Sequence, residues 1–352
     1  MDNTKTRIFV IATAASLIKM LQKAVFFLAV LTVTQPCIFA SETKEINLVL
    51  FGGSMATAIY VAEDTGLLAE ENLAVNVSDT PDSIYLMTEL VKGTYDIAQA
   101  SIDNFFAYQA GQGAVPLDRE PDLRIVMGGS TMKLDLVVSQ DVNGYDDIKG
   151  EMLGVDALTT GWAFVLKEML MNGGLNESDY HFIETGSSAK RIDALKAGEY
   201  RATLLEGNYI NQAYDAGFKR LDDSLASLGP YQGSSFGVSK AWAESNRGTL
   251  IALIRAYIKA TEIIYNKSRR DEVVGSLVKH AFMKPANARK TIEQLTSGSY
   301  GLTPKAAIDM HGVATVLALR NQHGRPQADF SNLNDFVDMS YYEGALRSLE
   351  AD

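Results

Sequence analysis

The chain has 352 residues, of which 47% are hydrophobic, 9% aromatic and 21% charged, and this composition excludes a largely disordered protein. This length exceeds what one hydrophobic core usually fills, so the sequence predicts two folding units. The formal net charge of −11 makes nucleic acid and anionic lipid poor partners, and we expect no nucleic-acid binding.

Residues 1–40 have the features of a signal peptide. A basic start is followed by a short apolar run over residues 24–33, whereas a membrane-spanning helix needs roughly 20 apolar residues. Pro36 then ends the helix, and Ala40 suits the position before a cleavage point. We expect cleavage after Ala40 and a location in the periplasm. An uncleaved anchor is the alternative, and translation beginning at Met20 would shorten the basic start.

Cys37 is the single cysteine of the sequence, and the expected cleavage removes it. The mature chain then has no means to form a disulfide, a thiolate metal site or a cysteine nucleophile. The histidines show no pair at metal-ligand spacing; they are His181, His280, His311 and His323. No Gly-x-Ser-x-Gly, Walker or dinucleotide-binding motif is present. The sequence therefore predicts no metal, no cofactor and no catalytic residue.

From Glu45 the predicted elements alternate between strand and helix. We expect strands over residues 46–51, 73–77, 95–99 and 123–127, with helices over 54–68, 83–91 and 104–109 between them. Gly52 and Gly53 end the first strand, and Ser54 is a natural helix cap. This rhythm predicts a mostly parallel sheet with helices on both faces.

The same rhythm then starts again. We expect strands over residues 134–139, 152–156, 180–184, 202–205 and 218–221, with helices over 160–171, 188–197 and 209–216. In the first of these helices Trp162 begins an apolar stripe at helical spacing. Beyond Ser235 the pattern is mostly helical, and residues 333–349 predict a short turn and a final helix. The fold class is therefore α/β, with two lobes that each hold a mostly parallel sheet flanked by helices.

Four segments carry a recognisable pattern. Residues 58–77 lead from a helix into a Gly-Leu … Asn-Leu turn, and residues 92–98 contain a Gly-x-x-Asp-hydrophobic-Ala step. Residues 145–155 are similar to an Asp-Leu-Lys-Gly-Lys-x-Ile-Gly-Val link, and residues 193–202 to an Ala-Leu-x-x-Gly-x-Val-Asp-Ala step. In this order the segments resemble the SsuA-like and thiamine-pyrimidine-precursor-like substrate-binding proteins of ABC transporters.

The match covers nearly all of residues 46–349, but two departures leave the ligand open. Arg201 stands where the family often has Asp, and residues 156–161 replace a shorter Gly-Ser turn.

The resemblance implies a type II periplasmic-binding-protein fold. Its first lobe would comprise residues 45–133 plus 235–352, and its second lobe residues 134–234. Two hinge crossovers would join the lobes, near residues 133–134 and 234–236. The resemblance also implies a monomer that captures a small-molecule ligand and delivers it to an ABC permease and ATPase complex.

Two other functions stay open. One is an enzyme of the same fold that acts in cofactor biosynthesis, and the other is a sensor that presents a ligand to a membrane receptor. The fungal thiamine-pyrimidine synthases resemble this fold, but they carry a cysteine-rich motif that the mature chain lacks.

The ligand is expected between the lobes, at the carboxyl ends of the strands, where helix N-termini leave backbone N–H groups free. The candidate ligand-binding residues follow the predicted strands: Phe51, Ser54, Met55, Ser101, Asp103, Asn104, Ser130, Thr131, Thr159, Thr160, Trp162, Glu206, Asn208 and Phe236.

Several of these candidates have a structural explanation as well. Ser54 and Thr160 are also explained as helix caps, and Asp103 as an N-cap. The aromatic candidates are also explained as core residues; these are Phe51, Trp162 and Phe236. Glu206 directly follows an apolar strand, and we expect a role for it in ligand binding or in the hinge.

The charge of the candidates favours one class of ligand. They include two carboxylates and no arginine, and Lys133, at the expected hinge, is the nearest cation. A sulfonate or carboxylate ligand usually recruits arginine. We therefore expect a neutral or cationic nitrogen-containing or aromatic compound, stacked on Trp162 or Phe51. A sulfonate or other small anion held by helix N-termini is the alternative.

Overall fold

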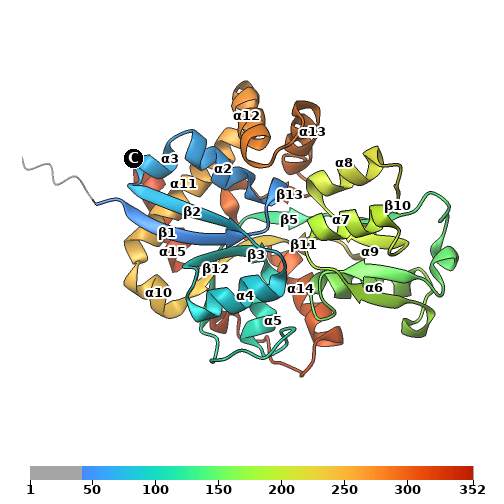
Figure 1. The fold of residues 1–352 in the computed structure, drawn as a ribbon. Helices are drawn as coiled ribbons and strands as arrows, with labels where there is room; N and C mark the ends of the chain where they lie inside the picture. Colours follow the sequence, from blue (N-terminus) through green and yellow to red (C-terminus); the bar gives the residue numbers. More distant parts are fainter. Residues whose placement is uncertain (1–41, 352) are drawn as a thin grey trace, which may run out of the picture. The chain divides into compact units, whose positions relative to one another are not determined.

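The computed structural model describes residues 42–351, and the chain from Thr43 onward forms one unit with two five-stranded sheets (Figure 1). The signal peptide predicted over residues 1–40 and its cleavage point lie outside the described residues. Among the helices of residues 42–351, none has the length and apolar character needed to cross a membrane.

The first sheet has the strand order β2-β1-β3-β12-β4. Its strands are β1 (Lys44–Leu50), β2 (Leu73–Asp79), β3 (Ile97–Ser101), β4 (Leu123–Gly128) and β12 (Ser234–Ser239). Strand β1 is parallel to β2 and β3, whereas β12 is antiparallel to both of its neighbours. The sheet is mostly parallel, as predicted, with one antiparallel strand that arrives from the second half of the chain.

Helices cover both faces of this sheet. The helices of the first half of the chain are η1 (Gly53–Ala56), α2 (Thr57–Asp64), α3 (Leu67–Glu70), α4 (Ser83–Lys92) and α5 (Ile102–Gln109). Those of the last third are α10 (Lys240–Ser245), α11 (Arg247–Tyr265), η4 (Lys267–Arg269), α12 (Arg270–His280), α13 (Pro285–Leu295), η5 (Pro304–Ala306), α14 (Met310–His323), η6 (Leu333–Asp335) and α15 (Ser340–Ala351). Helices α2, α11 and α15 lie on one face, and α4 and α5 on the other (Figure 1).

The apolar run of β1 is explained by this double cover. Ile46, Leu48 and Leu50 are fully buried in one core cluster with residues of α2 and α11, and Val49 is fully buried in a second cluster with residues of α4 and α5. A strand buried on both faces needs consecutive apolar residues and not an alternating pattern.

The second sheet has the order β10-β6-β9-β7-β8. Its strands are β6 (Asp135–Val138), β7 (Met152–Val155), β8 (His181–Glu184), β9 (Ala202–Leu205) and β10 (Lys219–Asp223). The helices around it are η2 (Tyr145–Ile148), α6 (Gly161–Asn172), η3 (Glu177–Asp179), α7 (Ser188–Ala197), α8 (Gly207–Asp215) and α9 (Ser224–Leu228). Strands β8, β7 and β9 are parallel, and β6 is antiparallel to β9 and β10. We call the parts built on the two sheets the first and the second lobe.

A small third sheet joins the lobes. It has the order β11-β5-β13, with β5 (Ser130–Met132), β11 (Tyr231–Gln232) and β13 (Gly301–Leu302). The chain enters the second lobe after β5 and leaves it through β11, and these two strands pair antiparallel with each other. The two crossovers are therefore hydrogen-bonded neighbours. The predicted lobe boundaries at residues 133/134 and 234/235 stay a prediction.

The structure corrects several predicted helix starts. The helix predicted over residues 54–68 is divided into η1, α2 and α3, and Ser54 caps none of them. Helix α5 begins at Ile102 with Ser101 as its N-cap, so the alternative of Asp103 as an N-cap is wrong. By contrast, the short turn and final helix predicted over residues 333–349 correspond to η6 and to α15, which begins at Ser340.

The C-terminal part of the chain, predicted to belong to the first lobe, also contacts the second lobe. Helix α14 packs against α6 of the second lobe as well as against α5 of the first. Glu168 of α6 accepts hydrogen bonds from Gln322 at 3.0 Å and lies 2.9 Å from His323 Nε2. Arg320 donates to the carbonyl oxygen of Thr159 at 2.6 Å. Helix α14 is thus a third link between the lobes, beside the two crossovers.

Candidate ligand-binding site

A cavity of about 320 Å³ lies between the two lobes. The first lobe contributes residues at the carboxyl ends of β1, β2 and β3, including Phe51 and Asp79. The second lobe contributes the N-cap residues of α6, α7 and α8, which are Thr160, Ser187 and Glu206. Strand ends therefore face helix N-termini across the cavity, as the sequence predicted.

Most of the predicted site residues line this cavity. They are Phe51, Met55, Ser101, Asp103, Asn104, Thr160, Trp162, Glu206 and Asn208. Ser54, Ser130 and Thr131 line a second cavity of about 500 Å³, which shares Met55, Met132 and Glu206 with the first. The helix-cap explanation of Thr160 is confirmed, because its hydroxyl accepts a hydrogen bond from the Ala163 N–H at 3.3 Å.

Two candidates line neither cavity. Phe236 is fully buried in the core, with its ring centroid 4.9 Å from that of Tyr257. Thr159 contributes its backbone carbonyl to Arg320 instead. Sequence reasoning placed both at strand ends, but Phe236 lies within β12, a strand that runs antiparallel to its neighbours.

Arg191 lines the cavity, although no arginine was expected there. It is 2% exposed, and its guanidinium lies 5.1 Å from the Trp162 ring centroid. It donates to the carbonyl oxygen of Gly186 at 2.5 Å, to Ser188 Oγ at 2.9 Å and to the carbonyl oxygen of Leu204 at 3.3 Å. Much of its donor capacity is therefore directed to the protein. No local pattern marks this arginine for burial, because a lone arginine in the first turn of a helix resembles a solvated residue.

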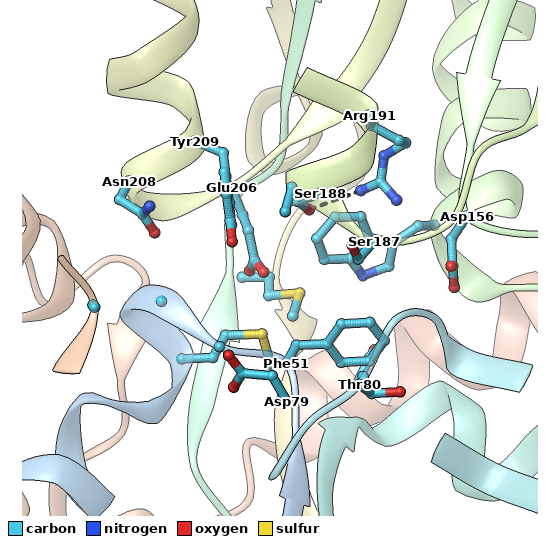
Figure 2. Close-up of a pocket in the computed structure, with 18 of the residues that line it drawn as sticks. Phe51, Asp79, Thr80, Asp156, Ser187, Ser188, Arg191, Glu206, Asn208 and Tyr209 are labelled. Atoms are coloured by element: carbon cyan, nitrogen blue, oxygen red, sulfur yellow. Dashed lines mark hydrogen bonds between the residues drawn. The ribbon is translucent and has the colours of Figure 1, made fainter. Parts of the chain in front are cut away.

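Glu206 and Asp79 point into the same space from opposite lobes (Figure 2). No described residue donates a hydrogen bond to the carboxyl group of Glu206, and burial raises the pKa of this group to about 7, with the nearby Arg191 charge opposing the rise. Burial also raises the pKa of Asp79, whose carboxyl group likewise receives no hydrogen bond from residues 42–351. These two groups are free to accept donors from a bound molecule.

Two further acids in the cavity wall are held by the protein. The Asp103 carboxylate accepts hydrogen bonds from Arg320 Nε at 2.5 Å, from Arg320 Nη2 at 2.8 Å and from the Gly161 N–H at 2.5 Å. Asp156 Oδ2 accepts the Ser83 hydroxyl at 2.5 Å, whereas its buried Oδ1 has no hydrogen-bond partner among the described residues, and burial raises the pKa of this group. Asp103 therefore joins α5, α14 and the start of α6, and its charge is neutralised within the wall.

Other residues of the wall were not predicted as ligand contacts. They are Gly52, Gly53, Tyr60, Asp79, Thr80, Met132, Asp156, Gly161, Ser187, Ser188, Ala189, Arg191, Tyr209, Gln212, His280, Ala281 and Phe282. Asp79 and Thr80 lie at the end of the second predicted strand, and the prediction took no candidate residue from that strand end. Gly52 lets the Asp79 carboxyl group lie close to the backbone, because a Cβ at this position would lie 2.8 Å from the carboxylate oxygens and would displace them.

This arrangement of two lobes around an inter-lobe cavity is that of the periplasmic binding proteins. The nitrate-binding protein NrtA from Synechocystis PCC 6803 superposes with a TM-score of 0.73 over 89% of this chain and 90% of that chain, at 12% identity. The alkanesulfonate-binding protein SsuA from Xanthomonas axonopodis pv. citri superposes with a TM-score of 0.63 over 80% of this chain and 93% of that chain, at 16% identity.

The chain belongs to the NMT1-like family, whose model matches residues 40–278. It is also 25% identical over 241 residues to the formylaminopyrimidine-binding protein of Halalkalibacterium halodurans. That alignment covers 63% of this chain and 66% of the relative, so the chain spans slightly less than two thirds of its length. The predicted resemblance to SsuA-like and thiamine-pyrimidine-precursor-like binding proteins, and the predicted two-lobe fold, are confirmed.

Proposed function

We propose that this chain is an exported solute-binding protein of an ABC import system and that it binds a small nitrogen-containing aromatic molecule between its lobes. The observation that carries this proposal is the Glu206 carboxyl group, which is half-buried, faces the cavity and receives no hydrogen bond from the described residues. A ligand that fills the cavity removes this group from water, and one that donates an N–H to it avoids the cost of leaving it without a partner.

The rest of the wall fits the same class of ligand. Phe51 and Trp162 supply ring faces for a flat heterocycle, and Asp79 supplies a second acceptor from the opposite lobe. Exocyclic amino groups of an aminopyrimidine are donors of the required kind. The relationship to a formylaminopyrimidine-binding protein supports this choice.

Binding would favour closure of the lobes. Phe51 and Asp79 belong to the first lobe, and Trp162 and Glu206 to the second, so a solute that touches all four holds the lobes together. A ligand that contacts both lobes only when they are closed shifts the population toward that state. The closed monomer would then deliver the solute to the permease and ATPase complex in the membrane. Export to the periplasm is part of this proposal, and the named relatives are binding proteins, which supports it over an enzyme or a sensor.

A small anion is the second candidate ligand, because Arg191 and the N-termini of α6, α7 and α8 border the cavity. Two observations disfavour it. Arg191 directs donors to Gly186, Ser188 and Leu204, and the Asp79 carboxylate, which lines the same cavity, would repel an anion.

Isothermal titration calorimetry separates the two candidates. We expect 4-aminopyrimidines, with and without a formylaminomethyl group, to bind, and we expect nitrate, taurine and longer alkanesulfonates to give no heat. Glu206→Gln should weaken aminopyrimidine binding by about 1–3 kcal/mol. Glu199→Gln, which changes an exposed glutamate, is the matched control. Tight sulfonate or nitrate binding without any response to aminopyrimidines would overturn the assignment of the ligand.

A further inference from the structure

The second cavity borders the first along a partition of shared wall residues. It measures about 500 Å³ against about 320 Å³, and the residues common to both are Met55, Met132 and Glu206. Methionine side chains are unbranched and adapt their shape to what they contact. The partition can therefore yield to a solute that extends beyond the first cavity, with Glu206 contacting its middle.

Both lobes contribute to the second cavity. The first lobe supplies Leu295 of α13, and the second lobe supplies Ile210 of α8. The joining sheet supplies Ser130 and Thr131 of β5 and Leu302 of β13. The lining thus includes both apolar side chains and hydroxyl groups, and a solute in this cavity would contact both lobes and the joining sheet at once.

Apart from Glu206, the charged groups of this cavity are paired within the protein. Lys133 lies 2.6 Å from Asp135 and 3.7 Å from Asp223, and Arg220 lies 3.5 Å from Asp223. The Tyr214 hydroxyl donates to Asp135 at 2.6 Å. A charged group on a solute would have to compete with these pairs, so the cavity favours an uncharged one.

The wall also carries an amide that has no side-chain hydrogen bond among the described residues. The amide of Gln294 lines the second cavity and forms no side-chain hydrogen bond with any residue of the described chain, and its Oε1 is buried. An amide offers both a donor and an acceptor, which an uncharged amide or hydroxyl group on a solute satisfies. The unpaired Gln294 amide is therefore the group that would recognise the far end of a long solute.

We infer that the binding site extends past Glu206 into the second cavity and that the natural solute is elongated, with a nitrogen-containing aromatic head and an uncharged tail that ends in an amide or hydroxyl group. This inference rests on the proposed function, since it assigns the head to the first cavity. The tail adds apolar contacts with α8 and α13, which should slow release of the solute.

The test is a series of 4-aminopyrimidines with linear tails of increasing length that end in a hydroxyl, an amide, a carboxylate or an ammonium group. For the uncharged tails, affinity should rise about fourfold for each methylene buried until the second cavity is filled. The charged tails should bind no better than the head alone. Equal affinity for the head and for every uncharged tail would overturn the inference and leave the proposed function intact.

Thr131→Phe places a ring in the second cavity and should abolish the gain from the tail. Thr131→Ser keeps the cavity open and is the matched control. Where Thr131→Phe does not fold, Gln294→Ala replaces it and should reduce the gain from an amide or hydroxyl tail about two- to tenfold. A gain that survives both Thr131→Phe and Gln294→Ala would contradict the inference.

If no head compound binds, the proposed ligand fails, and the extended site is judged on the solute that co-purifies with the chain. Native mass spectrometry should show that solute in the wild-type protein and in Thr131→Ser, and its loss from Thr131→Phe. Equal occupancy in all three proteins, or no solute beyond solvent in any, would overturn the extended site.

Discussion

The buried ion pair between Arg320 and Asp103 is the place where a single change should cost most stability. Arg320 is fully buried and Asp103 is 1% exposed. The guanidinium also donates to Gln112 Oε1 at 3.3 Å and to the Thr159 carbonyl at 2.6 Å, and it lies 4.7 Å from the Phe164 ring centroid. One side chain of α14 thereby joins α5 of the first lobe to the segment before α6 of the second.

Arg320→Met keeps most of the side-chain volume and removes the charge. It leaves the Asp103 carboxylate in the interior with the Gly161 N–H as its remaining donor. Breaking one side of a buried pair typically costs 3–5 kcal/mol, because the other charge is left uncompensated. We therefore expect the free energy of unfolding to fall by about 3–5 kcal/mol, with the Gly161 hydrogen bond keeping the loss toward the lower value.

Urea unfolding followed by circular dichroism measures this loss. Arg347→Met is the matched control, because Arg347 is exposed and its pair with Glu343 spans 3.7 Å on the surface of α15. That control should change the free energy of unfolding by less than about 0.5 kcal/mol. Asp103→Asn combined with Arg320→Met should recover part of the loss, since no buried charge then lacks a partner. An Arg320→Met protein as stable as the control would refute the reasoning.

Three further predictions concern the cavity and its walls. Burial raises the pKa of Glu206 from 4.5 to about 7. The contribution of Glu206 to the free energy of unfolding is therefore fully present below about pH 4.5 and is lost as pH rises through about 7. In urea titrations, the unfolding free energy of the wild type minus that of Glu206→Gln should fall by about 2–3 kcal/mol between pH 4.5 and 8. Gly161→Ala should lower the unfolding free energy by about 1–3 kcal/mol, because its Cβ would meet neighbouring atoms at 2.3–2.6 Å. Gly275→Ala, where the added Cβ would lie in open space on helix α12, should raise the unfolding free energy by about 0.5–1 kcal/mol. Equal shifts in the melting temperatures of the two variants would contradict this prediction. Trp162 lines the cavity and Trp242 does not, so a bound heterocycle should change the fluorescence of Trp242→Phe but not that of Trp162→Phe; a response kept in Trp162→Phe would remove Trp162 from the site.

Local pattern was sufficient to predict the α/β alternation. The run 46–51 and the stripe that begins at Trp162 each correspond to an element with the expected buried residues, in β1 and α6. Such elements are predictable because their periodicity depends only on which faces are buried. The candidates at the ends of β1, β3, β7 and β9 line the cavity for the same reason, since parallel strands bring their carboxyl ends to one edge.

What the sequence did not predict depends on contacts between distant segments. Arg320 meets Asp103 across 217 positions of the chain, and nothing in the local pattern of α14 marks one arginine for complete burial. The burial of Arg191 has the same cause, because this residue of α7 donates to the Leu204 carbonyl of β9. In both cases a cation is buried because acceptors from several elements converge on it, which is a property of the assembled lobes.

The two buried arginines and Glu206 differ in whether the protein supplies hydrogen-bond partners for them, and this difference indicates the kind of ligand. Arg320 and Arg191 are surrounded by protein acceptors, whereas the Glu206 carboxyl faces the cavity with no donor among residues 42–351. A protein interior satisfies its buried polar groups almost everywhere, so an unsatisfied one in a cavity wall indicates the polarity of what binds there. Arg191 in the cavity wall already donates to three protein acceptors, whereas Glu206 accepts from no described residue, and this asymmetry favours a solute that brings donors.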